Sequence, residues 1–242
     1  MSHGADANEP EARYIPVEAV EYEPRAGCRR TSRKHLLTTE RLEIHQTVIG
    51  GRGDADDYGI SATNRVAYVL SGTATVKHED PAQAETHVAR GHLIVIPAGA
   101  SWGTELAVTS DDLVLLEVAR SVTGSVPARA PSSEEPARVH AVDPHDVTPY
   151  EPAGHALTTN RCLFVDEHME LIEGSIARGG GAERHLHRQH EQFLYVLAGA
   201  PVPLLIYYPR GAPHGTGGGV SEPLELLVIY SPPLGESKNA LA

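Results

Sequence analysis

The sequence contains few cysteines and no long apolar run. Two cysteines, Cys28 and Cys162, cannot supply a disulfide framework, and they lie too far apart along the 242 residues to form a zinc knuckle. No apolar run approaches the roughly 20 residues that a membrane-spanning helix requires. Residues 1–14 are polar and acidic and lack the apolar core of a signal peptide. We therefore expect a soluble, cytoplasmic protein with no membrane partner.

Positive charge is also scarce. The formal net charge is −12 at pH 7, and the sequence pI is about 5.6. Binding of nucleic acid requires a concentrated basic face, and the one basic run is short, comprising Arg29, Arg30, Arg33 and Lys34. We interpret this run as a solvated segment and expect no nucleic-acid partner.

Short apolar runs separated by turn residues are abundant. Runs such as RVAYVLSG, HLIVIP, QFLYVLAG and LELLVIYSPP are rich in Val, Ile, Leu and Tyr, and clusters of Gly, Pro, Asp and Ser lie between them. This pattern predicts many short β-strands joined by turns. No long stretch has a helical period. The predicted fold class is therefore all-β, a sandwich or a barrel.

Three short segments of the first half recur in the same order in the second half. The pairs are YEPRAG and YEPAG (22–27 and 150–154), LTTER and LTTNR (37–41 and 157–161), and YVLSG and YVLAG (68–72 and 195–199). A stretch rich in Pro, Ser and Ala separates the two halves. We predict two copies of one β module. The N-terminal domain spans residues 1–120, a linker spans 121–138, and the C-terminal domain spans 139–242.

One segment of the second copy is rich in possible metal ligands. RHLHRQHEQFLYVLAG places His185 and His187 two positions apart, and Glu191 and Gln192 follow before an apolar run. Alternate side chains of a β-strand share a face, so the two histidines can bind one cation. A third histidine, His214, follows a proline-glycine turn in PRGAPH that fixes its direction.

These segments resemble the two sequence motifs of the cupin superfamily. Gly179, HxH, an acidic or amide residue and Gly199 match the first motif, and Pro209, Gly211 and His214 match the second. The duplication makes the chain look like a bicupin. The resemblance implies two double-stranded β-helix (jelly-roll) barrels in tandem. It also implies one divalent transition metal ion, Zn, Mn, Ni or Fe, in the C-terminal barrel.

The resemblance leaves two residues as alternatives for the fourth metal ligand. Strand alternation from His185 and His187 selects Glu191, whereas the spacing that the family keeps before Gly199 selects Gln192. A loop over the polar residues RQHE would reset the alternation, and we therefore favour Gln192. A glutamine leaves the full charge of the dication and a stronger Lewis acid, whereas a glutamate removes one unit of charge.

Three further side chains are weaker candidates for catalytic roles. Tyr207 and Tyr208 precede the second motif, and one of them must face inward, where a phenol near a metal can act as an acid or base. Arg184 could meet a substrate carboxylate, but alternation points it away from His185. The alternative interpretation is structural: the tyrosines pack in the barrel core, and the arginine faces solvent.

The two copies differ in their ligands and in their lengths. Aligned on Gly72, the first copy carries Tyr58, Ile60, Asn64, Arg65 and Trp102 at the ligand positions. We therefore expect a metal-free first barrel. Nine residues separate Gly199 from Pro209, whereas 24 separate Gly72 from Pro97. One edge of the second barrel must therefore be shortened, swapped or covered by another element, because open strand edges promote aggregation.

The predicted function is that of a metal-dependent enzyme acting on a small oxygenated metabolite, which chelates the ion through two oxygens. Zn, Mn or Ni would support isomerase, lyase or cyclase chemistry, and iron would support a dioxygenase. The alternative is a non-catalytic metabolite-binding or sensor protein. We expect a small-molecule substrate as partner and a homodimer as the assembly.

Overall fold

The computed structural model confirms the predicted all-β class. The structure describes residues 10–56, 61–77, 85–100, 106–121, 138–200 and 203–234. Regular structure in these ranges consists of β-strands and two short 3-10 turns, Val17–Ala19 and Pro144–Asp146. Among these residues, no helix has the length and apolar character needed to cross a membrane.

The chain divides into two compact units. Unit 1 comprises Met1–Ala19 and Val147–Ala242, and unit 2 comprises Val20–Asp146. These boundaries differ from the expected domains, because an N-terminal strand pairs within unit 1 and His140–Val142 pairs within unit 2. Residues 122–137 of the expected linker lie outside the described part of the chain.

Unit 2 consists of two sheets around an apolar core. Its strands are β2 (Glu23–Pro24), β3 (Thr31–Thr38), β4 (Leu42–Gly50), β5 (Gly53–Asp54), β6 (Arg65–Ser71), β7 (Ala74–Val76), β8 (Thr86–Val88), β9 (Leu93–Ile96), β10 (Leu106–Val108), β11 (Asp112–Arg120) and β12 (His140–Val142). The sheet orders are β12-β9-β6-β11-β4-β3-β2 and β5-β10-β7-β8. Val76 and Leu106 of the smaller sheet join Ile94 and Leu115 of the larger sheet in one buried cluster. Two sheets that enclose a single core in this way form a jelly roll.

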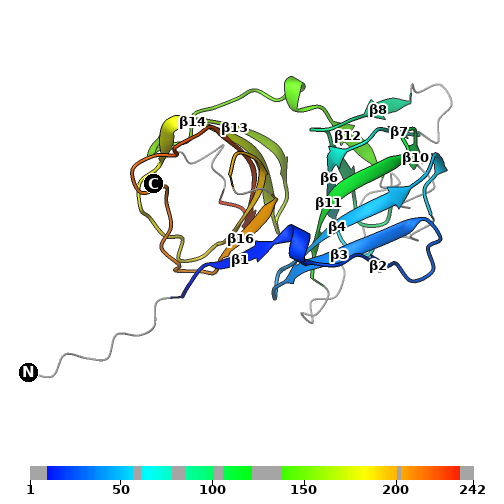
Figure 1. Ribbon diagram of the computed structural model, residues 1–242, viewed down its shortest axis with the longest axis horizontal. Helices are drawn as coiled ribbons and strands as arrows, with labels where there is room; N and C mark the ends of the chain where they lie inside the picture. The colour runs from blue at the N-terminus through cyan, green and yellow to red at the C-terminus, as the bar shows by residue number, and fades with distance from the viewer. Residues whose placement is uncertain are drawn as a thin grey trace, which may run out of the picture. The chain divides into compact units, whose positions relative to one another are not determined.

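Unit 1 is one strongly curved sheet. Its strands are β1 (Arg13–Pro16), β13 (His155–Val165), β14 (Glu170–Ala182), β15 (Glu191–Ala198), β16 (Leu204–Tyr208) and β17 (Leu224–Ser231). Their order is β1-β16-β15-β17-β14-β13. Figure 1 shows this sheet nearly end-on, curling into a barrel.

Strand β17 is buried on both faces of this sheet. Its residues Leu226, Val228 and Tyr230 belong to the inner apolar cluster. The alternate residues Leu227 and Ile229 have no exposed surface, although they point to the other face. Burial on both faces explains why residues 226–230, LLVIY, form a continuous apolar run without polar alternation.

The N-terminal strand covers the edge that the short β15–β16 connection leaves open. β1 pairs antiparallel with β16, from Arg13 opposite Tyr207 to Pro16 opposite Leu204. The backbone N–H of Val17 then donates to the carbonyl of Pro203 at 3.2 Å, and the Val17 side chain is buried. We expected this edge to be shortened, swapped or covered by another element. In the structure it is covered by another element, β1.

Two of the three sequence repeats occupy matching places in the two units. YEPRAG reaches β2 beside β3, and Tyr150 of YEPAG forms a bridge to Asn160 of β13. The closing glycines Gly72 and Gly199 both have positive φ, 85° and 96°, and a Cβ at Gly199 would lie 2.7 Å from the Pro223 carbonyl oxygen. The LTTER correspondence is wrong, because LTTER runs from the end of β3 through the turn into β4 and LTTNR lies within β13.

We predict that removal of residues 1–17 destabilises unit 1 by about 2 kcal/mol or more, because the buried Val17 side chain alone contributes about that amount. Loss of β1 also exposes the β16 edge and should promote aggregation. Urea unfolding followed by circular dichroism measures the first effect, and light scattering measures the second. The control variant lacks residues 1–9 and keeps β1. Equal unfolding midpoints for the two truncations would contradict the role assigned to β1.

Candidate metal centre

Three histidines from the two motifs converge at one end of the unit 1 barrel. His185 and His214 form an isolated antiparallel bridge, in which the backbone N–H of each donates to the carbonyl of the other at 2.8 Å. The ring of His187 lies 5.0 Å from each of the other two rings, measured between centroids. One ring nitrogen from each histidine lies within 4.8 Å of the others. The three side chains are therefore close enough to serve as ligands of one ion.

Backbone carbonyls set the tautomers of two of these rings. Nδ1 of His185 lies 2.7 Å from the carbonyl oxygen of Glu183, and Nδ1 of His214 lies 2.9 Å from that of Ala212. A carbonyl oxygen only accepts, so Nδ1 carries the proton and Nε2 keeps its lone pair. Histidines that bind metals commonly use this arrangement, in which the second nitrogen donates to a backbone carbonyl.

Two of these imidazoles, those of His187 and His214, are also held in the neutral form. Burial, followed by the neighbouring charges of His214 and His185, lowers the pKa of His187 to about 3. Burial likewise lowers the pKa of His214. Metals bind the neutral imidazole, so both rings are ready to act as ligands at neutral pH.

Three buried polar atoms near this point have no hydrogen-bond partner within the described residues. They are Nε2 of His187, Nε2 of His214 and Oε1 of Gln192. Buried polar side-chain atoms are normally paired. The amide nitrogen of Gln192 donates to the hydroxyl of Tyr230 at 3.3 Å, which leaves its amide oxygen as the unpaired atom. The chemistry of these atoms, two nitrogen lone pairs and one amide oxygen, fits a metal ligand set.

Glu191, the other candidate for fourth ligand, faces elsewhere. Its Oε1 accepts a hydrogen bond from the Tyr207 hydroxyl at 3.1 Å. Gln192 is opposite Tyr208 on one neighbouring strand and Tyr230 on the other, and all three line the pocket. Strand β15 begins at Glu191, so the residues between His187 and this strand break the alternation that selected the glutamate. Gln192 thus lines the same pocket as His185 and His214, whereas Glu191 does not.

The two candidate tyrosines point in different directions. The Tyr208 ring lies 4.6 Å from the His214 ring and lines the pocket. Tyr207 stacks on Phe193 at 5.0 Å between ring centroids, away from the pocket. Burial, with a smaller contribution from Tyr14, raises the pKa of Tyr208 to about 12, so its hydroxyl keeps its proton at neutral pH. Arg184 is exposed and does not line the pocket.

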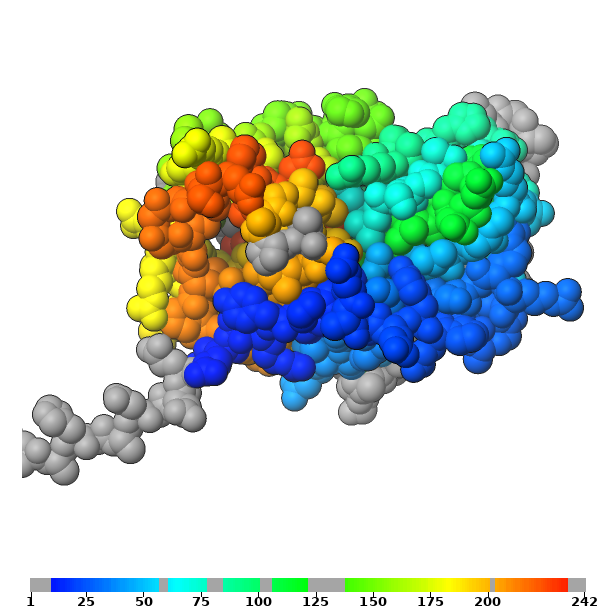
Figure 2. Space-filling view, viewed as in Figure 1, coloured from blue at the N-terminus to red at the C-terminus, as the bar shows by residue number. Residues whose placement is uncertain are grey.

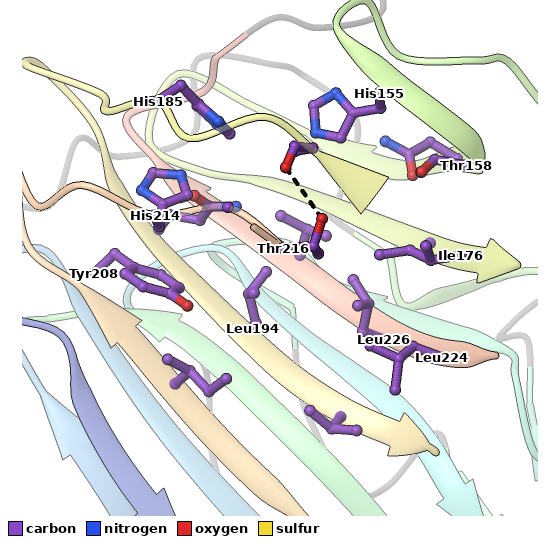
Figure 3. Close-up of a pocket in the computed structure, with 18 of the residues that line it drawn as sticks. His155, Thr158, Ile176, His185, Leu194, Tyr208, His214, Thr216, Leu224 and Leu226 are labelled. Atoms are coloured by element: carbon purple, nitrogen blue, oxygen red, sulfur yellow. Dashed lines mark hydrogen bonds between the residues drawn. The ribbon is translucent and has the colours of Figure 1, made fainter. Parts of the chain in front are cut away.

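The pocket beside the histidines has a volume of about 190 Å³. In Figure 2 the yellow and orange segments of unit 1 frame a hollow. Figure 3 shows His185 and His214 at one end of the pocket, with Leu224 and Leu226 towards the other. A dashed line marks the hydrogen bond, 3.1 Å long, from the Thr216 hydroxyl to the carbonyl of Ala182.

Sequence reasoning missed three polar residues of the pocket. His155, Thr158 and Asn160 lie on β13 and line the cavity. The ring of His155 lies 5.9 Å from that of His185, and its Nδ1 is 2.9 Å from the carbonyl oxygen of Ala153. None of the three lies within the two motifs that identified the candidate ligands, and so their inward position was not predicted.

Unit 2 carries a buried ion cluster on the inner face of its larger sheet. Glu117, which is 1% exposed, pairs with Arg33 at 3.0 Å and with Arg65 at 2.5 Å. Burial opposes ionisation, but the guanidinium groups of Arg65 and Arg33 hold the pKa of Glu117 at about 2. Among the described residues, the one group of metal-ligating side chains is that of unit 1. Three first-copy residues compared with the ligands, Tyr58, Ile60 and Trp102, lie outside the described part of the chain.

Comparisons with known proteins support the fold. No protein-family model matches the sequence, and no curated protein matches it significantly. Protein Ylba from E. coli is 15% identical with a TM-score of 0.67, over 95% of this chain and 94% of that one. Oxalate decarboxylase from Lactobacillus farciminis, in a formate complex, is 14% identical with a TM-score of 0.62, over 96% and 88%. A candidate dioxygenase from Nostoc punctiforme is 15% identical with a TM-score of 0.67, over 91% and 82%.

The chain shares the fold of these solved structures. At these identities the likeness shows the fold alone, and a jelly-roll fold is what the sequence motifs led us to expect. Coverage of nearly the whole chain means that both units contribute to the match. The same architecture carries many chemistries, so the reaction has to be argued from the pocket of unit 1.

The ion cluster of unit 2 predicts a pH dependence. The Glu117 pKa is depressed from 4.5 to about 2, so its contribution to stability is complete above pH 4.5 and is lost as the pH falls towards 2. Glu117→Gln should cost about 3 kcal/mol at pH 7, because it leaves two partly buried arginines without their counter-charge. Urea unfolding at several pH values measures both effects. The control Asp111→Asn, at an exposed ion pair, should change neither. An unchanged midpoint in the Glu117 variant would contradict this assignment.

Proposed function

We propose that unit 1 binds one divalent transition metal ion and that the protein is a metal-dependent enzyme acting on a small oxygenated metabolite. The proposed ligands are His185, His187, His214 and Gln192. The observation that carries the proposal is the cluster of unpaired, buried ligand atoms at the end of an open pocket. Fold neighbours that include an oxalate decarboxylase support a catalytic role without specifying the reaction.

The ligand set predicts the character of the ion. Three neutral imidazoles and one neutral amide remove no charge, so a bound dication would act as a strong Lewis acid towards substrate oxygens. Zn, Mn, Ni and Fe all accept such nitrogen and oxygen donors. Because the proposed ligands His185, Gln192 and His214 line the cavity, a substrate in the pocket can reach the ion directly.

Residues of the pocket wall supply the remaining functions. Tyr208 lies beside His214 and keeps its proton at neutral pH; its hydroxyl is hydrogen-bonded to Tyr14 and would exchange this partner to donate to a substrate oxygen. Tyr230 accepts the hydrogen bond from the Gln192 amide and so holds the amide oxygen towards the histidines. The apolar side chains around the cavity exclude water from the reacting atoms.

Metal identity separates the reaction classes. With Zn, Mn or Ni the site would stabilise an enolate, as isomerases, lyases and cyclases require, whereas iron would direct it towards dioxygenase chemistry. The competing function, a metabolite-binding or sensor protein, would show metal and ligand binding without turnover. The expected homodimer stays a prediction that light scattering after size-exclusion chromatography tests.

The metal content of the purified protein tests the proposal. We expect about one equivalent of a transition metal in protein purified without a histidine tag, and loss of this metal in His187→Ala. His190→Ala is the matched control, because His190 lies beside His187 but is not among the proposed ligands. Elemental mass spectrometry after dialysis gives both values. Absence of metal from the wild type, even after reconstitution, would overturn the proposal.

A second pair of variants tests the fourth ligand. Gln192→Leu should weaken metal binding by more than about 100-fold, because loss of even an outer-shell partner costs about 10–100-fold. Glu191→Gln should retain the metal, since this carboxylate pairs with Tyr207. Competition with a fluorescent chelator gives both affinities. The reverse outcome would make Glu191 the ligand.

A further inference from the structure

Apolar side chains form most of the pocket wall of unit 1 away from the candidate metal ligands. Figure 3 shows His185, His214 and Tyr208 towards one end, and Leu224 and Leu226 towards the other, with His155 and Thr158 above them. The other apolar wall residues are Ile176, Leu194, Val196, Ile206 and Val228, and they outnumber the polar residues of β13. A ligand that fills this space therefore needs polar atoms at the histidines and a mainly apolar body.

No charged side chain lines the cavity among the residues that the structure describes. The polar groups of its wall are histidine, amide and hydroxyl groups. A carboxylate away from the metal would lose its hydration here without gaining a counter-ion. The wall thus disfavours a ligand that carries a second charge on its body.

Unit 2 shows that the fold can carry charge at comparable positions. On β11, Glu117 is opposite Ala67, and on β17, Val228 is opposite Leu194 in the equivalent pair of strands. Arg65 precedes Ala67 by the same two residues by which Gln192 precedes Leu194. The inner face of unit 2 therefore holds an arginine and a glutamate where that of unit 1 holds an amide and a valine. The apolar wall of unit 1 is a property of its sequence and is not imposed by the fold.

The size of the cavity limits the apolar body. A buried apolar cavity of about 150 Å³ holds a benzene molecule, and the cavity here measures about 190 Å³. A body of about six carbon atoms therefore fits within the walls, with its polar end at the histidines.

We infer that the substrate of unit 1 is a metal chelator with one pair of oxygens, an apolar body of about six carbons and no second charged group. This inference rests on the proposed metal site and deepens it. The oxygens bind at the ion beside Tyr208, and the body packs against Leu194, Leu224 and Leu226. Small dicarboxylates are excluded as preferred substrates.

Straight-chain 2-oxo acids test this inference on the full-length protein loaded with one equivalent of Zn²⁺. Isothermal titration calorimetry compares pyruvate, 2-oxobutanoate, 2-oxopentanoate, 2-oxohexanoate and 2-oxooctanoate, whose apolar tails run from one carbon to six. Each added methylene should tighten binding by about fourfold, the value expected for burial of one such group. The matched pair 2-oxopentanoate and 2-oxoglutarate differs by one terminal carboxylate, and the dianion should bind at least about tenfold more weakly.

Two variants test whether the apolar pocket wall causes the preference for longer chains. Leu226→Ala should weaken 2-oxohexanoate binding by at least about fourfold and leave pyruvate binding unchanged, since only the longer chain reaches this side chain. Val165→Ala, at an exposed position on β13, should change neither affinity.

Two results would overturn the inference, namely an affinity independent of chain length or 2-oxoglutarate binding as tightly as 2-oxopentanoate. The metal content of the same samples separates this failure from failure of the proposed function. Protein that holds no zinc would overturn the metal site itself. Protein that holds zinc but shows no preference for apolar chains would overturn the substrate class alone.

Discussion

The backbone bridge between His185 and His214 is the contact on which the candidate site depends. It joins segments that are 29 residues apart, and each histidine both donates to and accepts from the other. Because neither residue belongs to a long strand, this bridge and the adjacent carbonyl contacts fix the directions of both rings. Burial then keeps the pKa of His214 low, so the ring that the bridge orients is also neutral. Geometry and protonation therefore favour the same ligand role.

Strand β17 of unit 1 contributes to this arrangement through burial on both of its faces. Its inner residues form part of the pocket wall, and Leu227 and Ile229 are fully buried on the other face. A slip of one residue would exchange the pocket-facing residues of β17 with these two, so the pocket depends on the pairing of β17 with β14 and β15. The pairing of β1 with β16 covers the β16 edge of the sheet.

Local patterns in the sequence predicted the all-β class and the residues that meet at the pocket end, because HxH and PRGAPH combine ligands with the turns that aim them. The position of Gln192 was harder to predict, since it depends on where β15 begins after an irregular loop. Pairing between strands far apart in the sequence could not be predicted. Nothing within residues 13–16 indicates that they pair with β16, about 190 residues away. The inward position of His155 was missed because this residue lies outside both ligand motifs and reaches the pocket only through the pairing of β13 with β14.

The central claim is that Gln192 and three histidines share one metal ion at the end of an apolar pocket. A crystal structure of the metal-loaded protein, measured at the absorption edge of its metal, tests this claim most directly. The account predicts one anomalous peak about 2.0–2.2 Å from a ring nitrogen of His185, His187 and His214 and from Oε1 of Gln192. A peak coordinated by Glu191, or anomalous density elsewhere with none at this cluster, would contradict it.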